Sequence, residues 1–234
     1  MIHPGVISVT KKIFWKDPYL TQLETYITGV KGNDITVDQT IFFAFSGGQE
    51  GDHGTIGNSH VLQARKEDRE IVYTLEQSHG LKRGDPVSIQ IDWGRRYQLM
   101  RLHFTAEIVL ELTYRNSESI KKIGAHIAQD KARIDFEWDG NISNVLTVIQ
   151  KEAFGIIEAN QEIISAFSNE ETEERYWEIV GFARVPCGGT HLKRTGEIGE
   201  IELKRKNPGK GKERIEIYVS ENSILKDQLG SAHE

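Results

Sequence analysis

The sequence predicts an α+β protein in which a small, mainly β N-terminal domain precedes a mixed α+β domain. Two observations lead to this fold class. Short β-rich runs separated by turn residues fill residues 1–92, whereas from Gly94 onward the hydrophobic residues recur at helical spacing. A domain boundary is therefore expected near Trp93, which divides the chain into residues 1–92 and 93–234.

The first domain is expected to be a small antiparallel barrel or sandwich. Its β-rich runs are separated by glycine, asparagine, aspartate and proline, as in strands joined by tight turns. A glycine-rich loop, SGGQEGDHGTIG, spans residues 46–57 between the second and third runs. The expected strands cover residues 23–30, 33–45, 60–67, 70–76 and 85–93.

The second domain is expected to alternate helices and strands. Residues 96–115 contain no proline or glycine, and Leu99, Leu102 and Ala106 recur at helical spacing. A second helix is expected to begin at Ser143, a candidate N-cap, and to run to residue 160. A third helix is expected over residues 169–179, and strands over residues 124–129, 132–138, 161–167, 199–206 and 213–219.

Composition is ordinary for a globular protein. Of the 234 residues, 38% are hydrophobic and 27% are charged, and no stretch approaches the roughly 18 consecutive apolar residues of a membrane span. The N-terminal residues lack the apolar segment of a secretory signal, and a single cysteine cannot form an intramolecular disulfide. We therefore expect a cytoplasmic protein without a membrane partner.

The charge pattern excludes a uniformly basic protein, and DNA is not an expected partner. The net charge is −6, yet residues 193–214 carry eight basic and four acidic residues, a balance of +4. Arg95, Arg96 and Arg101 form a second basic group. A solvated face is the simpler interpretation of each run, whereas two basic runs near one site indicate contact with a polyanion.

The chain's only cysteine, Cys187, is followed by two glycines and by His191 four residues later. Gly188 and Gly189 allow a tight turn without a Cβ penalty, so the thiolate and the imidazole could reach one ion. Cysteine and histidine are favoured ligands of zinc. A buried, inert cysteine beside an unrelated histidine remains the alternative.

A second pair of candidate ligands lies on the long expected helix. His103 and Glu107 are four residues apart, so their Cβ atoms lie about 5–6 Å apart on one face of the helix. Such pairs are common on helices that bind no metal, and a salt bridge is the alternative. Together, the two pairs are compatible with a tetrahedral zinc site.

Several motifs, in the same order, resemble a known family. CGGTHLKRTGEIG resembles the Cys-x-Gly-Thr-His segment of the alanyl-tRNA synthetase editing domain, which also occurs as free-standing alanyl-tRNA editing proteins of the AlaX type. KIFWKDPYLTQLETYI, SGGQEGDHGTIG, MRLHFTAE, AHIAQ with RIDF, and GKGKERIEI resemble further segments of that family. The chain is thus similar to the superfamily of the threonyl- and alanyl-tRNA synthetase second additional domain.

The resemblance implies a zinc-dependent hydrolase that acts in trans on alanine-specific tRNA carrying serine or glycine. An alanine-binding pocket rejects glycine and serine poorly, because one methyl group is worth only about 1–3 kcal/mol and an added hydroxyl is tolerated. A second site must therefore inspect the product. Zinc could polarise the ester carbonyl, activate water or position the substrate there.

The resemblance also implies the site residues. His103, Glu107, Cys187 and His191 would hold zinc, although Glu107 stands where the family has a second histidine. Glu107, Gln129 and Thr105 would serve catalysis, with Glu107 a ligand or a general base. The implied tRNA and substrate contacts are Gly47, Gly48, Gln49, Asp52, Gly54, Arg95, Arg96, Thr190, Lys193, Arg194, Lys204, Arg205, Lys206, Lys210, Lys212 and Arg214.

Alternatives remain at this stage. Thr105 and Thr190 could instead satisfy backbone groups. Glu107 leaves open a catalytically weakened relative that still binds tRNA, and a zinc-stabilised interaction module without RNA is a further alternative. The sequence predicts neither the preference between serine and glycine nor an oligomeric state.

Overall fold

The computed structural model describes residues 9–76 and 79–220, which form two compact units. The first unit comprises the described residues up to Ser46 together with Glu50–Arg96. The second comprises Gly47–Gln49 and the described residues from Tyr97 onward. Strands dominate the described residues and two α-helices accompany them there, so the predicted α+β class is confirmed.

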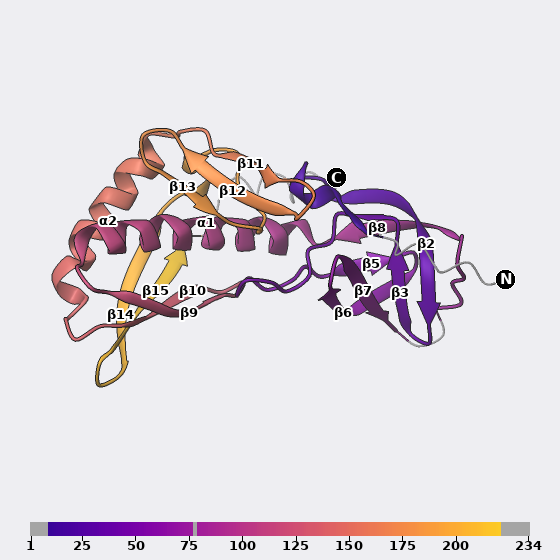
Figure 1. The fold of residues 1–234 in the computed structure, drawn as a ribbon, viewed down its shortest axis with the longest axis horizontal. Helices are drawn as coiled ribbons and strands as arrows, with labels where there is room; N and C mark the ends of the chain where they lie inside the picture. Colours follow the sequence, from indigo (N-terminus) through magenta and orange to yellow (C-terminus); the bar gives the residue numbers. More distant parts are fainter. Residues whose placement is uncertain (1–8, 77–78, 221–234) are drawn as a thin grey trace, which may run out of the picture. The chain divides into compact units, whose positions relative to one another are not determined.

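Antiparallel strands build the first unit. Six of them pair in the order β2-β3-β7-β6-β5-β8, which closes on itself as a small barrel (Figure 1). A short parallel pair, β1 with β4, accompanies the barrel. The strands are β1 (Lys11–Lys12), β2 (Gln22–Lys31), β3 (Asp34–Val37), β4 (Gln39–Thr40), β5 (Gly54–Ile56), β6 (Ser59–Glu67), β7 (Glu70–Leu75) and β8 (Pro86–Ile91).

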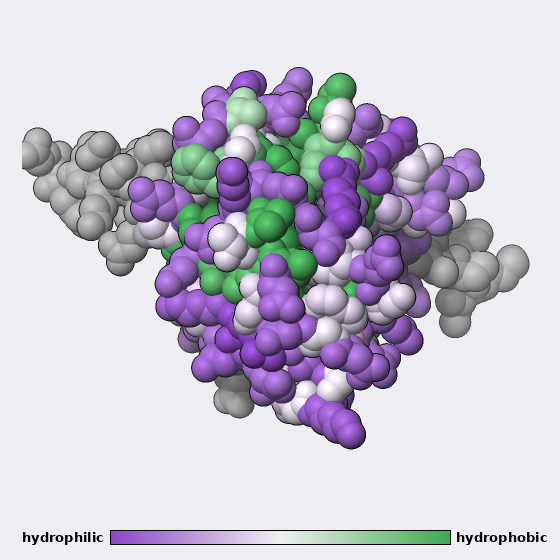
Figure 2. All heavy atoms as spheres, turned by 90° about the vertical axis from the view of Figure 1, so that its left-hand side faces the viewer, coloured by the Kyte–Doolittle hydropathy of each residue, from purple (hydrophilic) through white to green (hydrophobic). Residues whose placement is uncertain are grey.

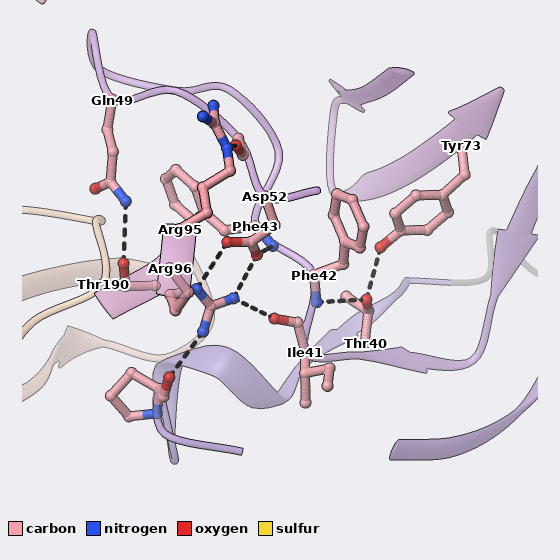
Figure 3. Close-up of polar contacts among 12 residues, drawn as sticks. Thr40, Ile41, Phe42, Phe43, Gln49, Asp52, Tyr73, Arg95, Arg96 and Thr190 are labelled. Carbon is pink, nitrogen blue, oxygen red and sulfur yellow. Dashed lines mark hydrogen bonds and ion pairs between the residues drawn. The ribbon is translucent and has the colours of Figure 1, made fainter. Parts of the chain in front are cut away.

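The strand expected over residues 33–45 is shorter than predicted. After β4 the chain runs as a buried, irregular segment that includes Phe42 and Phe43. Side chains replace the strand partner: the Phe42 amide donates to Thr40 Oγ1 at 3.0 Å, and the Phe43 amide donates to Asp52 Oδ2 at 2.6 Å (Figure 3). This apolar segment therefore belongs to the hydrophobic core although it is not part of a sheet. Nearby side chains accept the hydrogen bonds of its backbone amides.

The second unit is built around helix α1 (Trp93–Asn116), as predicted. Figure 1 draws α1 between a four-stranded sheet and a three-stranded sheet, and its side chains from Leu99 to Leu112 are nearly all buried. The antiparallel sheets have the orders β14-β15-β10-β9 and β11-β12-β13. The strands are β9 (Lys121–Ile127), β10 (Ala132–Glu137), β11 (Ile164–Asn169), β12 (Glu174–Ile179), β13 (Ala183–Pro186), β14 (Ile201–Gly209) and β15 (Lys212–Val219).

The helix predicted over residues 169–179 is wrong. The Asn169 side chain accepts the amides of Glu171 and Thr172, which closes a turn, and strand β12 follows. Within β12, Arg175, Trp177 and Ile179 are buried at every second position. This period-two pattern is the signal of a strand with one buried face, and it outweighs the helical preference of the surrounding glutamates.

Helix α2 (Ser143–Glu158) forms where predicted, but Ser143 is not its N-cap. The N-cap position is Ile142, and Asn141 Oδ1 accepts the Ser143 amide at 3.0 Å. The helix packs against β14, and a groove of about 530 Å³ lies beside it, lined by Leu146, Phe154 and Leu203 among others. Figure 2, which faces the left-hand side of Figure 1, shows hydrophobic side chains gathered near the middle of that face.

The helices found in the described ranges lack the combination of length and apolar character that crossing a membrane requires.

Candidate metal centre

Three side chains that are distant in sequence meet in the second unit. His103 comes from α1, while Cys187 and His191 lie in the segment that follows β13. Cys187 Sγ lies 3.5 Å from His103 Nε2 and 3.3 Å from His191 Nε2, and the three donor atoms all lie within 4.8 Å of one another. The structure therefore brings together three of the four predicted zinc ligands.

Outer partners orient both imidazoles. His103 Nδ1 lies 3.3 Å from the Thr190 carbonyl oxygen, and His191 Nδ1 lies 2.8 Å from Ser165 Oγ. A carbonyl oxygen can only accept, so in a neutral His103 ring the proton sits on Nδ1 and the Nε2 lone pair faces Cys187. Metal-binding histidines are commonly fixed in this way. No sequence signal marked Ser165, because its position depends on how β11 runs beside the cysteine loop.

Only one of the two glycines after Cys187 is required by close packing. A Cβ at Gly189 would lie 2.2 Å from His103 Cε1 and 2.9 Å from Gln49 Oε1, far inside van der Waals contact. A Cβ at Gly188 would have no heavy atom within 4 Å. Gly189 therefore lets the cysteine loop pass directly over the His103 ring.

Burial and charge act in opposite directions on His103. Burial alone would lower its pKa, but the charge of Cys187 and hydrogen bonds to Cys187 and Glu107 outweigh it and raise the pKa to about 10. Burial lowers the pKa of His191, and the positive charges of His103 and Arg175 add to this effect. The cluster therefore stabilises a positive charge at His103 Nε2 and keeps His191 neutral.

The donor set fits a zinc ion. Two imidazole nitrogens and one sulfur converge, both histidines are buried, and their outer nitrogens are already engaged. Nitrogen and sulfur donors are the combination that zinc prefers over calcium or magnesium.

Glu107 lies beside the cluster but outside the group of three. Its Oε1 is 3.6 Å from His103 Nε2, and its Oε2 accepts a hydrogen bond from Trp177 Nε1 at 2.9 Å. Burial opposes its ionisation, yet the hydrogen bond and charge of His103 outweigh burial and lower its pKa. One carboxylate oxygen is thus fixed by Trp177 while the other faces the cluster. Its assignment as a zinc ligand stays a prediction.

Thr105 and Gln129, the other two predicted catalytic side chains, lie in different environments. The Thr105 hydroxyl donates to the Arg101 carbonyl at 2.7 Å, which is the backbone-satisfying role left open for it. Gln129 is exposed in the turn between β9 and β10. The catalytic roles of both residues stay predictions.

The tip of the glycine-rich loop belongs to the second unit. The Ile127 amide donates to the Gly48 carbonyl at 2.8 Å, and Gln49 forms an isolated bridge with Ile127. Gly48 has φ +90°, and a Cβ there would lie 2.6 Å from the Ala125 carbonyl oxygen. Gly48 must therefore be glycine for the tip to lie against β9.

Gln49 extends from this tip toward the cysteine loop. It is 2% exposed, and its Nε2 donates to Thr190 Oγ1 at 3.0 Å (Figure 3). Its Oε1 is buried without a hydrogen-bond partner in the described part of the chain. Buried amide oxygens rarely stay unpaired, so this atom is available to a group that enters the site.

The remaining loop residues serve the first unit. Arg96 is fully buried, where its Nε donates to Asp52 Oδ1 at 2.9 Å and its Nη2 donates to the Ile41 carbonyl (Figure 3). Arg95 pairs with Glu50 at 2.7 Å. These guanidinium groups support the barrel, and the prediction that they contact tRNA stays untested. A Cβ at Gly54 would clash with the Gln90 carbonyl at 2.0 Å, so Gly54 is needed for strand packing.

Ion pairs or hydrogen bonds hold several side chains of the basic run at residues 193–214. Lys204 pairs with Glu202 at 2.9 Å, and Arg205 pairs with Glu213 at 2.6 Å. Arg214 pairs with Asp135, and Arg194 donates to the Asn160 side chain at 3.2 Å. These contacts argue against the whole run acting as one tRNA surface. Lys193, Lys206, Lys210 and Lys212 complete the run, and their tRNA contacts also stay predictions.

Comparisons with known proteins agree with the motif pattern. Residues 178–216 match the family model described as the threonyl and alanyl tRNA synthetase second additional domain. A protein of Pyrococcus horikoshii named alanyl-tRNA editing protein AlaX-M is 32% identical over 220 residues, covering 92% of this chain and 100% of that protein. The protein of that name from Saccharolobus solfataricus is 32% identical, covering 90% and 99%.

This chain is also similar to one part of a longer protein, an alanine–tRNA ligase. The alanine–tRNA ligase of Methanococcus aeolicus is 29% identical over 265 residues, covering 97% of this chain but only 28% of the ligase. The similarity therefore extends over nearly all of this chain and over one part of the ligase.

Proposed function

Because the chain belongs to the AlaX family of alanyl-tRNA editing proteins, we propose that it hydrolyses the ester of tRNA(Ala) mischarged with serine. Glycine is the second candidate amino acid. The reaction is carried out in trans, in the cytoplasm, and depends on zinc. The observation that carries this proposal is the convergence of His103, Cys187 and His191 on one point.

The three converging residues would hold the zinc ion through two Nε2 atoms and one Sγ. A bound zinc would supply Lewis acidity to the ester carbonyl or to the attacking water. Thr190 and Ser165 keep both imidazoles in the orientation that this requires. Glu107 would accept a proton or act as a fourth ligand through Oε1, because Trp177 already holds its Oε2.

Gln49 and Thr190 would recognise the amino acid. Serine differs from alanine by one hydroxyl, and correctly charged tRNA must escape hydrolysis. The buried Gln49 Oε1 can accept a hydrogen bond from that hydroxyl, while Thr190 holds the other end of the amide. A site built to hydrogen-bond a hydroxyl rejects an analogue without it by a factor of about 10⁴–10⁵, because its polar group is otherwise left unpaired, so this contact favours serine over glycine as well as over alanine.

The direct test is deacylation of tRNA(Ala) charged in turn with serine, glycine and alanine. We expect release of serine, sparing of alanine, and zinc close to one ion per chain in the same preparation. If the protein binds tRNA but releases no amino acid, it is a catalytically weakened relative, the alternative suggested by Glu107. Absence of both activities would favour a zinc-stabilised interaction module.

Replacing Gly48 with valine should slow deacylation severalfold more than it lowers zinc content. A side chain there would collide with the Ala125 carbonyl and require a φ that valine rarely adopts, so Gln49 would move away from Thr190. The measurement is kcat/KM for Ser-tRNA(Ala) together with metal analysis. Gly32, which has φ +62° and no neighbour within 4 Å of an added Cβ, is a matched control site for replacement by asparagine. If Gly48→Val has wild-type kinetics, the glycine-rich loop only joins two strands and has no part in deacylation.

A further inference from the structure

A basic pocket with an aromatic wall lies at the end of the four-stranded sheet that is remote from the loop tip. We call it the Trp138 pocket; its volume is about 550 Å³. It is formed where β9 begins, β10 ends and the β14–β15 hairpin turns. Its lining residues are Ser119, Lys121, Glu137, Trp138, Asp139, Lys210, Gly211 and Lys212.

The three lysines of this pocket differ from Lys204 and Arg205 on β14. Lys121, Lys210 and Lys212 are exposed, and none has an ion pair within the described ranges. By contrast, Lys204 and Arg205 are held by neighbouring carboxylates. The three lysines at the hairpin end therefore keep their positive charge for a polyanion.

Two carboxylates share the pocket and limit its charge. Glu137 lies opposite Lys121 on β9 and opposite Lys212 on β15, so it is flanked by lysines in the sheet register. Asp139 follows Trp138. The lysines still outnumber the carboxylates, and the pocket is positive overall at neutral pH.

Trp138 is fixed as one wall of the pocket. Its amide donates to the Gly211 carbonyl at 3.0 Å, which ties the end of β10 to the hairpin turn. A Cβ at Gly140 would lie 2.5 Å from the indole ring, so the backbone of Gly140 packs directly against it. An aromatic ring held in place beside lysines suits an RNA strand, because bases stack on the ring while phosphates meet the ammonium groups.

We propose that the Trp138 pocket binds a single-stranded or terminal stretch of RNA, with a base stacked on Trp138 and phosphates at Lys121, Lys210 and Lys212. This inference rests on the proposed function, because it supplies a second contact for the tRNA whose esterified end enters the metal centre. Lys121 and Ile127, which lies beside the loop tip, are six positions apart along β9, a span of about 20 Å. The esterified nucleotide alone does not cover that distance, so the pocket would hold a part of the tRNA upstream of it.

The test measures binding of uncharged tRNA(Ala) over a range of salt concentrations. Replacing Lys121, Lys210 and Lys212 together with alanine should weaken binding at least about tenfold. The slope of log K against the logarithm of salt concentration, called the salt slope below, should also become shallower by about 2 units, since each phosphate contact on a single strand contributes about 0.7. Trp138→Ala should weaken binding roughly 5- to 100-fold with little change in slope, and Trp138→Phe should restore most of it.

A matched triple variant controls for net charge. Lys66, Lys82 and Lys151 are also exposed, and their replacement by alanine removes the same charge elsewhere. Thermal unfolding and zinc content show whether each variant is folded. If the pocket triple variant and Trp138→Ala both bind tRNA(Ala) with wild-type affinity and salt slope, the proposal is overturned. If only the lysine variant loses affinity for tRNA(Ala), no base stacks on Trp138 and that part of the proposal is wrong.

A small substrate separates this proposal from the proposed function. Seryl-adenosine carries the ester but no phosphates that could reach the pocket, so the pocket variants should hydrolyse it at the wild-type rate. If the wild-type protein hydrolyses neither seryl-adenosine nor Ser-tRNA(Ala), the proposed function fails. The binding measurements on uncharged tRNA still decide on the pocket.

Discussion

Replacing Cys187 and His191 together with alanine should reduce zinc from near one ion per chain to a trace. It should also slow deacylation of Ser-tRNA(Ala) at least about a thousandfold, roughly 4 kcal/mol of barrier. Only His103 would remain of the three converging donors, and a single imidazole does not retain zinc against dilution. Elemental analysis and single-turnover deacylation on one preparation measure both effects. The same zinc occupancy in the double variant would overturn the assignment of the ligands.

Two neighbouring glycines provide a control within the same loop. Gly189→Ala should lower both zinc content and deacylation rate, though less than the double variant does, because its new methyl group would collide with the His103 ring. Gly188→Ala should keep zinc and activity, because its methyl group would meet no atom within 4 Å. If the two glycine variants behave alike, the loop does not pass closely over the His103 ring.

Zinc affinity should also fall in acid, because protons compete for the nitrogen and sulfur donors.

The long helix and the candidate ligands could be predicted because each signal is local. Residues 96–115 show an uninterrupted helical pattern, and the members of the pairs His103–Glu107 and Cys187–His191 are each four positions apart. Their outer partners could not be predicted in this way. Ser165 reaches His191, and Trp177 reaches Glu107, only because the strands that carry them pair in a particular register. Spacing within one segment carries no information about that register.

The basic run shows the same limit. Sequence alone treats Lys204 and Lys210 as equivalent positive charges six residues apart. In the folded sheet Lys204 pairs with Glu202, whereas Lys210 lies at the hairpin turn beside Trp138. Which lysine can meet a phosphate is decided by neighbouring carboxylates, and those are fixed by strand pairing. The charge count therefore indicated a polyanion partner without locating its contact.

Glu107→Gln should slow deacylation at least about tenfold, roughly 1.4 kcal/mol of barrier. The amide keeps the shape of the side chain, and its oxygen can still accept from Trp177 Nε1. The atom facing His103 would then be an uncharged NH₂ group, which neither binds a cation nor accepts a proton. Glu111→Gln, one turn further along α1, is the matched control, because it removes a carboxylate from the same helix.

The zinc content of Glu107→Gln distinguishes the two roles of the carboxylate. A fall in zinc together with rate identifies a fourth ligand, and Glu107→His should then retain zinc, because histidine is an equally good donor at that position. A fall in rate at full zinc occupancy identifies a proton acceptor held in place by Trp177. As a ligand, the carboxylate would join the Cys187 thiolate in offsetting the charge of Zn²⁺, which would make the ion a weaker Lewis acid. Wild-type zinc and rate in Glu107→Gln would exclude both roles and leave a buried ion pair with His103 as the function of Glu107.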